Sequence, residues 1–453
     1  MHRLILLALA VLPLSATPNV VLIMADDMGY ECISANGGTS YATPVFERVA
    51  HEGMRFSNCY SQPVCTPSRI KIMTGKYNWR NYRRFGRLEK GQTTFAHLMR
   101  QAGYVTGLTG KWQLWGGPET PQQPSGTTPD EAGFDEHMYW AYKFELSADE
   151  IARYGSVGPP GDRATSRFWH PGILKNNKYV HTTMDDYGPD MFSDFALDFI
   201  ERHKAEPFFL YYPMVLTHSP FVATPHSETV TEKTKFKSNP AYFADMVSYT
   251  DYLVGRLLEH IDQLGIAENT LVLFTGDNGT HRSLESKLGT RLVRGGKAFP
   301  EDAGTHVPLF ARWTGQVPAG LVNDDLIEFS DFFATLVDLV DRPMPAGDLL
   351  DGRSFLPQLL GGTGNPRDWI FVHYDRDPFL DEVPFPRVRF ARTKRFKLYD
   401  DGRFYDVPHD WDEERPLDPS IAPAGAATIR TMLQEALDLM PAWNPNNSGY
   451  EKQ

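Results

Sequence analysis

Apolar residues along the chain gather in short runs that are rich in β-branched side chains and end in polar residues. Such runs are typical of strands buried on both faces of a parallel sheet. On this basis we predict strands at residues 19–24, 105–108, 207–215, 270–275 and 307–312. The polar residues that follow these runs should then lie at the carboxyl ends of the strands.

Segments with helical periodicity alternate with these runs. The predicted helices cover residues 44–52, a stretch directly after Cys65, residues 94–103 and residues 242–264. Strands that alternate with helices indicate an α/β fold with a doubly wound, mainly parallel sheet flanked by helices. Residues 116–181 are rich in Gly, Pro, Thr and aromatic residues without a clear period, so we predict long loops that cover the site.

The pattern changes after about Trp369. Short strands with tight turns are predicted at residues 387–392, 396–399 and 403–407, followed by a last helix from about 423 to 439. These elements favour a small antiparallel C-terminal subdomain. We therefore divide the chain into an α/β domain at 18–368 and a smaller α+β subdomain at 369–453.

Residues 1–17 have the form of a signal peptide, with Arg3 ahead of a short apolar run and small residues at its end. A first buried strand or a membrane anchor is the alternative. No other segment is long enough for a transmembrane helix, so we expect a secreted or periplasmic protein with no integral span in the mature chain. The formal net charge of −12, without an extended basic face, disfavours nucleic acid as a partner.

Polar residues follow two of the predicted strands in equivalent positions: Asp26 and Asp27 after the first, and Asp277 and Asn278 after another. In an open α/β sheet these strand ends meet at one crevice, where ligands bind. Three carboxylates and an amide oxygen suit a hard cation, Ca²⁺ first and Mg²⁺ second. The alternative for Asp26 and Asp27 alone is a helix cap or a turn.

Cys65 lies just ahead of a predicted helix, because Pro67 suits a first turn and Thr66 could cap it. An anion or a nucleophile is favoured at such a position. From this position alone, Cys65 could be either a thiolate with a low pKa or an ordinary buried thiol. The run Cys65-x-Pro67-Ser68-Arg69, followed by Thr74-Gly75, resembles the signature of type I sulfatases, in which a maturation enzyme oxidises the cysteine to formylglycine.

The resemblance to sulfatases of the alkaline-phosphatase-like superfamily extends along the chain after residue 17. Its further motifs are Asp26-Asp27-Met28-Gly29, Gly110-Lys111-Trp112, Thr217-His218-x-Pro220, Gly276-Asp277-Asn278-Gly279 and Arg294-Gly295-Gly296-Lys297. The resemblance implies that Asp26, Asp27, Asp277 and Asn278 bind calcium. It also implies that Arg69, Lys111 and Lys297 contact the formylglycine or the sulfate oxygens, and that His218 donates a proton to the leaving oxygen.

The chain departs from the family pattern at two places. Gln113 stands where a histidine is common, and glutamine can donate and accept a hydrogen bond but cannot act as a base near neutral pH. Residues 302–308 differ from a common Glu-Gly-Gly-x-Arg-Val-Pro run, which we expect to support the fold more than the chemistry.

Residues 76–87 interleave basic and aromatic side chains and could form a subsite for an anionic glycan, or a charged face over an aromatic core. Trp169 and His170 are weaker candidates of the same kind. Cys32 and Cys59 could form a disulfide, but we favour two buried thiols.

Together these features predict a sulfatase that hydrolyses sulfate esters on a carbohydrate, through a formylglycine made from Cys65 and a bound Ca²⁺. One alternative is a phosphodiester or phosphonate hydrolase of the same superfamily. Another is a catalytically silent glycan-binding protein, which only Gln113 supports.

Overall fold

The computed structural model describes residues 17–116, 118–120, 123–154, 165–342, 349–376, 387–418 and 423–441. The predicted signal segment lies outside these residues except for Thr17, its last residue. Within the described ranges, none of the helices has both the length and the apolar character that crossing a membrane requires.

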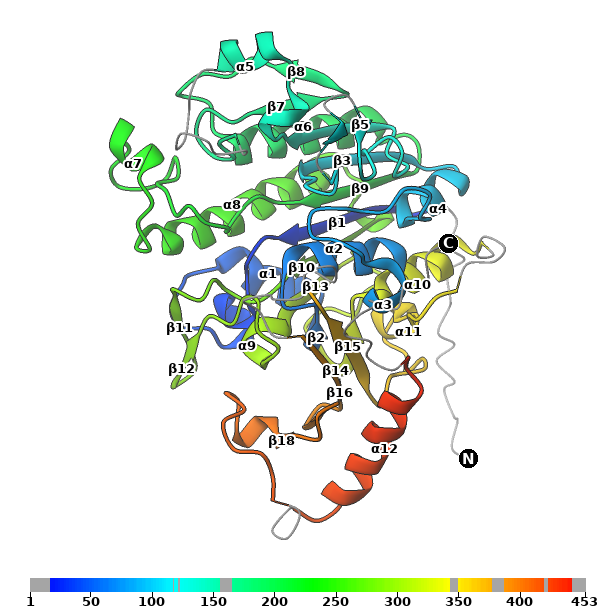
Figure 1. Cartoon of the computed structure of the whole chain (residues 1–453). Coiled ribbons are helices and arrows are strands. Elements are labelled where there is room, and N and C mark those ends of the chain that lie inside the picture. The colour runs from blue at the N-terminus through cyan, green and yellow to red at the C-terminus, as the bar shows by residue number, and fades with distance from the viewer. Residues whose placement is uncertain are drawn as a thin grey trace, which may run out of the picture.

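A large sheet of ten strands forms the centre of the molecule (Figure 1). Its strands are β1 (Asn19–Ala25), β2 (Met54–Tyr60), β3 (Val105–Lys111), β6 (Glu136–Trp140), β7 (Ile173–Lys175), β8 (Lys178–Val180), β9 (Phe208–Pro213), β10 (Thr270–Gly276), β13 (His306–Arg312) and β14 (Leu321–Glu328). They follow the order β14-β2-β13-β10-β1-β9-β3-β6-β7-β8. The block β10-β1-β9-β3-β6 is parallel, whereas β13, β7 and β8 run antiparallel to their neighbours. The predicted α/β class with a mainly parallel sheet is confirmed.

Helices cover both faces of this sheet. The α-helices are α1 (Pro44–Glu52), α2 (Cys65–Thr74), α3 (Asn78–Asn81), α4 (Phe95–Gln101), α5 (Ala148–Tyr154), α6 (Gly188–His203), α7 (Glu232–Phe236), α8 (Tyr242–Gln263), α9 (Asp302–Thr305), α10 (Ser330–Val340), α11 (Leu356–Leu359) and α12 (Ala426–Asp438). Short 3₁₀ helices occur at Tyr30–Cys32, Ser34–Asn36, Lys143–Glu145, Ala267–Asn269 and Val407–His409.

The two faces of β1 show how the layers form. Val20, Leu22 and Met24 belong to one apolar cluster with residues of α2, α4 and α10. Val21 and Ile23 belong to another with residues of α1, α6 and α8. Because side chains alternate along a strand, a continuous apolar run is what two covered faces require.

A second sheet of four antiparallel strands follows near the C-terminus: β15 (Ile370–Tyr374), β16 (Val388–Arg392), β17 (Phe396–Tyr399) and β18 (Phe404–Asp406). One of its faces packs against α12 through side chains such as Leu398 and Leu433. On the other face, Tyr374 and Phe390 share a cluster with Val64 and Cys65. The small sheet therefore covers the N-terminal end of α2.

A buried lysine and a buried ion pair attach this small sheet to the main body. Lys71 of α2 pairs with Glu328 and donates to the Phe371 carbonyl at 3.2 Å. Arg392 of β16 pairs with Asp302 of α9. The Asp302 carboxylate thus holds the C-terminal sheet in place, in agreement with a supporting role for residues 302–308.

The structure corrects several predicted elements. Residues 116–181 are not only loops, because β6, β7, β8 and α5 lie among them and three of these extend the large sheet. The last helix begins at Ala426 and not near Pro423, since Gly425 before it is left-handed. Two short ladders were also not predicted: β4 (Pro118–Thr120) with β5 (Gln123–Pro124), and β11 (Glu285–Leu288) with β12 (Arg291–Arg294).

Candidate active site

The four residues predicted to bind a metal lie together at the carboxyl ends of β1 and β10, which are parallel neighbours. All four are buried: Asp26, Asp27, Asp277 and Asn278. The Asp27 amide donates to Asp277 Oδ1 at 3.0 Å, and Asn278 Nδ2 donates to Asp27 Oδ1 at 2.9 Å. The sheet topology thus joins two motifs that are about 250 residues apart in sequence.

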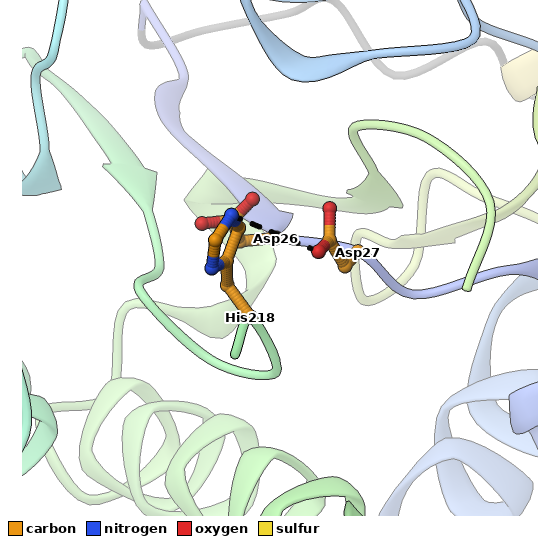
Figure 2. A group of neighbouring side chains, drawn as sticks. All are labelled: Asp26, Asp27 and His218. Atoms are coloured by element: carbon orange, nitrogen blue, oxygen red, sulfur yellow. Dashed lines mark ion pairs between the residues drawn. The ribbon is translucent and has the colours of Figure 1, made fainter. Parts of the chain in front are cut away.

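This cluster has the chemistry of a cation site. Burial, together with the negative charge of Asp26, raises the pKa of Asp277 well above its usual value. Asn278 Oδ1 is buried and accepts no hydrogen bond from the described residues. Ligand atoms of Asp26, Asp27 and His218 lie within 4.8 Å of one another and turn toward each other (Figure 2). These oxygens fit a hard cation, and His218 adds a nitrogen that we had not predicted as a ligand.

Two lysines balance part of the negative charge. Lys111, the last residue of β3, donates from Nζ to both Asp26 oxygens at 2.9 and 2.8 Å. Lys297 Nζ lies 2.6 Å from Asp27 Oδ2. Burial alone would lower the pKa of each lysine. The Asp26 carboxylate nevertheless raises the pKa of Lys111, and the Asp27 carboxylate raises that of Lys297, with Cys65 adding to both effects. Both lysines therefore stay charged beside the cysteine.

Cys65 is the first residue of α2, preceded by Val64 in an extended conformation. The predicted capping role of Thr66 is wrong, because this residue is already inside the helix and its Oγ1 accepts from the Gly86 amide at 3.1 Å. The Cys65 side chain is buried, with 3% of the residue exposed. It lies at the positive end of a buried ten-residue helix, as predicted for a nucleophile or an anion site.

Arg69 lies one helical turn after Cys65 and is buried. Its Nη1 donates to the Trp112 carbonyl at 2.5 Å, and its Nη2 donates to the Lys111 carbonyl. The guanidinium therefore holds the backbone that carries Lys111. Through these contacts Arg69 fixes the position of the lysine relative to the helix.

Gln113 has a positive φ of 48° and donates from Nε2 to the Tyr142 hydroxyl at 2.5 Å. Its Oε1 is buried and has no hydrogen-bond partner among the described residues. Burial raises the pKa of Tyr142, against the nearby charges of Arg167 and Lys111. Tyr142 and Arg167 are site residues that the sequence did not reveal, because both lie in the segment without a clear period.

His218 lies in the loop after β9, where Asp26 and Leu216 pair through their backbones. Its Nδ1 donates to the Ser219 carbonyl at 2.5 Å, so Nε2 is the atom that faces Asp27, 3.8 Å from its Oδ2. Burial, with Lys297 and Arg167 nearby, lowers the pKa of His218 to about 3. The structure thus places the imidazole beside the carboxylate cluster, and its role at the leaving oxygen stays a prediction.

The backbone of this region is packed without room for side chains at two glycines. A Cβ at Gly279 would lie 1.8 Å from the Ala303 carbonyl oxygen, and one at Gly296 would lie 2.3 Å from the Ala303 carbonyl carbon. The loop after β10 and the loop before Lys297 therefore both rest on α9. This contact explains why glycines follow Asn278 and precede Lys297.

The basic and aromatic segment at 76–87 is divided between core and surface. Tyr77 and Tyr82 are buried in the protein. Arg80 stacks on the Trp79 ring at 3.8 Å. Phe85 packs against the cluster that contains Cys65, so the end of the segment approaches the site.

Trp169 and His170 do not form an open sugar-stacking surface. Trp169 is buried, and its indole nitrogen donates to the Ala223 carbonyl at 2.7 Å. Lys235 lies over the Trp169 ring at 4.7 Å, and His170 bonds through its backbone amide to Asp186. Cys32 and Cys59 are free buried thiols, as we favoured.

We expect the Glu145→Gln variant to be more stable than the wild-type protein above neutral pH. Burial raises the pKa of Glu145 to about 7, although the Tyr142 amide and the Tyr139 hydroxyl donate to its carboxylate. Because the pKa of Glu145 is higher in the folded state, its contribution to the free energy of unfolding is complete below the unfolded-state pKa of about 4.5. This contribution is lost as the pH rises through about 7. Glutamine keeps the neutral form, so we expect a gain of about 2 kcal/mol at pH 8.5 and little at pH 4.5.

The measurement is urea unfolding at both pH values. Glu201→Gln, which removes an exposed carboxylate of α6, is the matched control and should show no such pH-dependent gain. An equal effect of Glu145→Gln at both pH values would contradict the raised pKa.

Comparison with known proteins decides the family. The family model for sulfatases matches residues 18–342, which is well over half of the chain. The chain belongs to the sulfatase family. Human arylsulfatase A is 32% identical over 417 residues, covering 88% of this chain and 78% of that protein. The predicted enzyme class, sulfuric ester hydrolase, is confirmed by this membership.

Two further proteins are similar to this sulfatase. An N-acetylgalactosamine-6-O-sulfatase of Bacteroides thetaiotaomicron is 28% identical over 417 residues, covering 79% of each chain. The structure of a phosphonate monoester hydrolase from Agrobacterium radiobacter superposes with a TM-score of 0.66 at 20% identity, covering 93% of this chain and 95% of that one. The second likeness concerns the fold alone.

Proposed function

We propose that this sulfatase hydrolyses a sulfate ester of a carbohydrate, with Cys65 as the precursor of a formylglycine nucleophile. The observation that carries the proposal is the position of Cys65, at the start of α2 and close to two charged lysines, Lys111 and Lys297. A sugar substrate is supported by the N-acetylgalactosamine-6-O-sulfatase among the relatives. The signal-like residues 1–17 support secretion or a periplasmic location, and we retain the division at 368/369.

Asp26, Asp27, Asp277 and Asn278 would hold Ca²⁺, because their oxygens converge and Asn278 Oδ1 has no other partner among the described residues. Bound there, Ca²⁺ would supply positive charge next to the sulfuryl group. A formylglycine at position 65, made by a maturation enzyme, would supply a hydroxyl nucleophile in place of a thiol.

The remaining roles belong to side chains of this chain. Lys111 and Lys297 stabilise the negative charge of the sulfuryl oxygens, since both remain charged in the buried site. Arg69 positions Lys111 through its backbone carbonyl. We assign His218 to the leaving oxygen, because its Nε2 faces the site while Nδ1 is held by Ser219. In this role Nε2 first takes the proton that the attacking hydroxyl releases and then gives it to the leaving oxygen.

Gln113 takes no proton in this scheme. Its Nε2 is bound to Tyr142, and its buried Oε1 can accept a hydrogen bond from a hydroxyl in the site. The amide therefore orients groups near Cys65 and leaves proton transfer to other residues.

The test is release of inorganic sulfate from a panel of sulfated oligosaccharides, using protein made together with a maturation enzyme. Aryl phosphodiesters and phosphonate esters in the same assay test the related phosphorus chemistry, whose only support is a shared fold. We expect sulfate release and much slower phosphorus ester cleavage. Glycan binding without any hydrolysis, by protein whose Cys65 is shown to be modified, would contradict the proposal.

A further inference from the structure

Arg167 is a cation of the site that none of the predicted roles uses. Its Nη1 lies 3.5 Å from Asp26 Oδ2, and its guanidinium lies 4.0 Å over the Trp140 ring. The Arg167 side chain is 11% exposed, so it is almost enclosed but still reaches solvent. It has no other ion pair with the described residues.

The position of this guanidinium is fixed by the surrounding backbone. Trp140 ends β6, is fully buried, and donates from its indole nitrogen to Thr165 Oγ1 at 2.9 Å. Gly188 at the start of α6 approaches the Arg167 carbonyl so closely that a Cβ there would lie 2.3 Å from its oxygen. The arginine is thus held on a rigid aromatic platform, which lowers the entropy lost when it binds a ligand.

Among the residues that the structure describes, few accept hydrogen bonds from Arg167. A guanidinium has five N–H donors, and the contact with Asp26 is at the outer limit of a hydrogen bond. The same Asp26 carboxylate already accepts two shorter bonds from Lys111. An anion with two oxygens in one plane or on one face would therefore be a better partner than Asp26.

The rings next to Arg167 show which edge of the site it occupies. The Trp140 ring under its guanidinium packs against the Tyr142 ring, with 4.8 Å between the ring centroids. Tyr142 in turn accepts a hydrogen bond from Gln113. Arg167 therefore lies at the edge of the site where β6 ends, where an anionic substituent of a substrate could meet it.

We propose that Arg167 binds a second anionic group, a carboxylate or a further sulfate, carried by the sugar that bears the sulfate ester. The preferred substrate class is then a sulfate ester on an acidic or multiply sulfated sugar. A local cation is needed for such a ligand, because a net charge of −12 opposes long-range attraction of polyanions. This inference rests on the proposed function for its substrate, but its test does not depend on turnover.

Binding is measured by calorimetry in a Cys65→Ala background, so that no ligand is consumed. The probes are three sugars with the same sulfate ester: one with a neighbouring carboxylate, one with a second sulfate and one with neither. Arg167→Gln should reduce the preference for a doubly charged sugar by about tenfold or more. Arg167→Lys should restore only part of it, since lysine lacks the planar pair of donors.

Lys178→Gln is the matched control, because it removes one positive charge from an exposed position on β8 in the same part of the sheet. It should keep the wild-type preference. An equal loss of affinity for all three sugars in Arg167→Gln would overturn the inference, since it would place Arg167 on the common sulfate or on the carboxylate cluster. A preference that responds to only one of the two doubly charged sugars identifies which anion Arg167 binds. Failure of wild-type protein to release sulfate, with the binding preference intact, would count against the proposed function and not against this subsite.

Discussion

Cys65→Ala is expected to reduce sulfate release by about a thousandfold or more while the protein stays folded. Alanine lacks the thiol that the maturation enzyme oxidises, so no aldehyde can form at Cβ. The fold should tolerate the change, because only a small side chain is lost from the cluster around Cys65. Activity is followed by ion chromatography of released sulfate. Unfolding in urea checks that the fold is intact.

The control for Cys65→Ala is Cys59→Ala, which removes another buried thiol from β2 without approaching the site. This variant should keep its sulfate release. Mass spectrometry of wild-type protein made with the maturation enzyme should show the Cys65 peptide about 18 Da lighter than the thiol form. Turnover by Cys65→Ala, or an unmodified Cys65 peptide in fully active protein, would contradict the assignment.

Asp277→Asn is expected to lose most of the stabilisation that Ca²⁺ gives the wild-type protein, without being less stable than the wild type when the metal is removed. The three carboxylates repel one another when no cation is bound, so neutralising one should leave the chelated variant at least as stable as the chelated wild-type protein. With Ca²⁺ at 100 times its Kd, the wild-type protein gains about 2.7 kcal/mol. The variant should gain far less and release sulfate much more slowly.

Thermal unfolding with and without a chelator measures this difference. Asp185→Asn, which removes a fully exposed carboxylate that pairs with Lys235, is the matched control and should respond to Ca²⁺ like the wild-type protein. If Ca²⁺ stabilised Asp277→Asn as much as the wild-type protein, Asp277 would not be a ligand.

The central part of the fold could be predicted from sequence because it obeys a simple rule. β1 and β10 are continuous apolar runs that end in acidic residues, and being parallel neighbours they bring Asp27 and Asp277 into hydrogen-bond contact. β2 and β14 were not predicted, since residues such as Arg55 and Asn323 interrupt their apolar pattern. Strands near the end of a sheet expose polar residues, and such strands give weaker signals.

The residues of the candidate site likewise fall into those that could be predicted from sequence and those that could not. Lys111, His218 and Lys297 lie in motifs that resemble those of sulfatases, and the resemblance implied that they share one site with the acidic residues, which they contact in the structure. Tyr142 and Arg167 lie in a segment whose order depends on tertiary contacts, such as the Trp140 platform and the start of α6. No local pattern encodes contacts of this kind. The sequence also did not predict that the Arg69 guanidinium donates to two backbone carbonyls.

The position of the C-terminal sheet limits when Cys65 can be modified. Tyr374 and Phe390 of that sheet pack into the cluster that buries Cys65, and the sheet is fixed by the buried Arg392–Asp302 pair. The strands that cover the cysteine begin at Ile370, so they are synthesised long after Cys65. A modifying enzyme needs access to Sγ, so we expect it to act on the growing or unfolded chain, before the C-terminal sheet docks. Once the small sheet has closed, an unmodified Cys65 should stay unmodified for the lifetime of the folded protein.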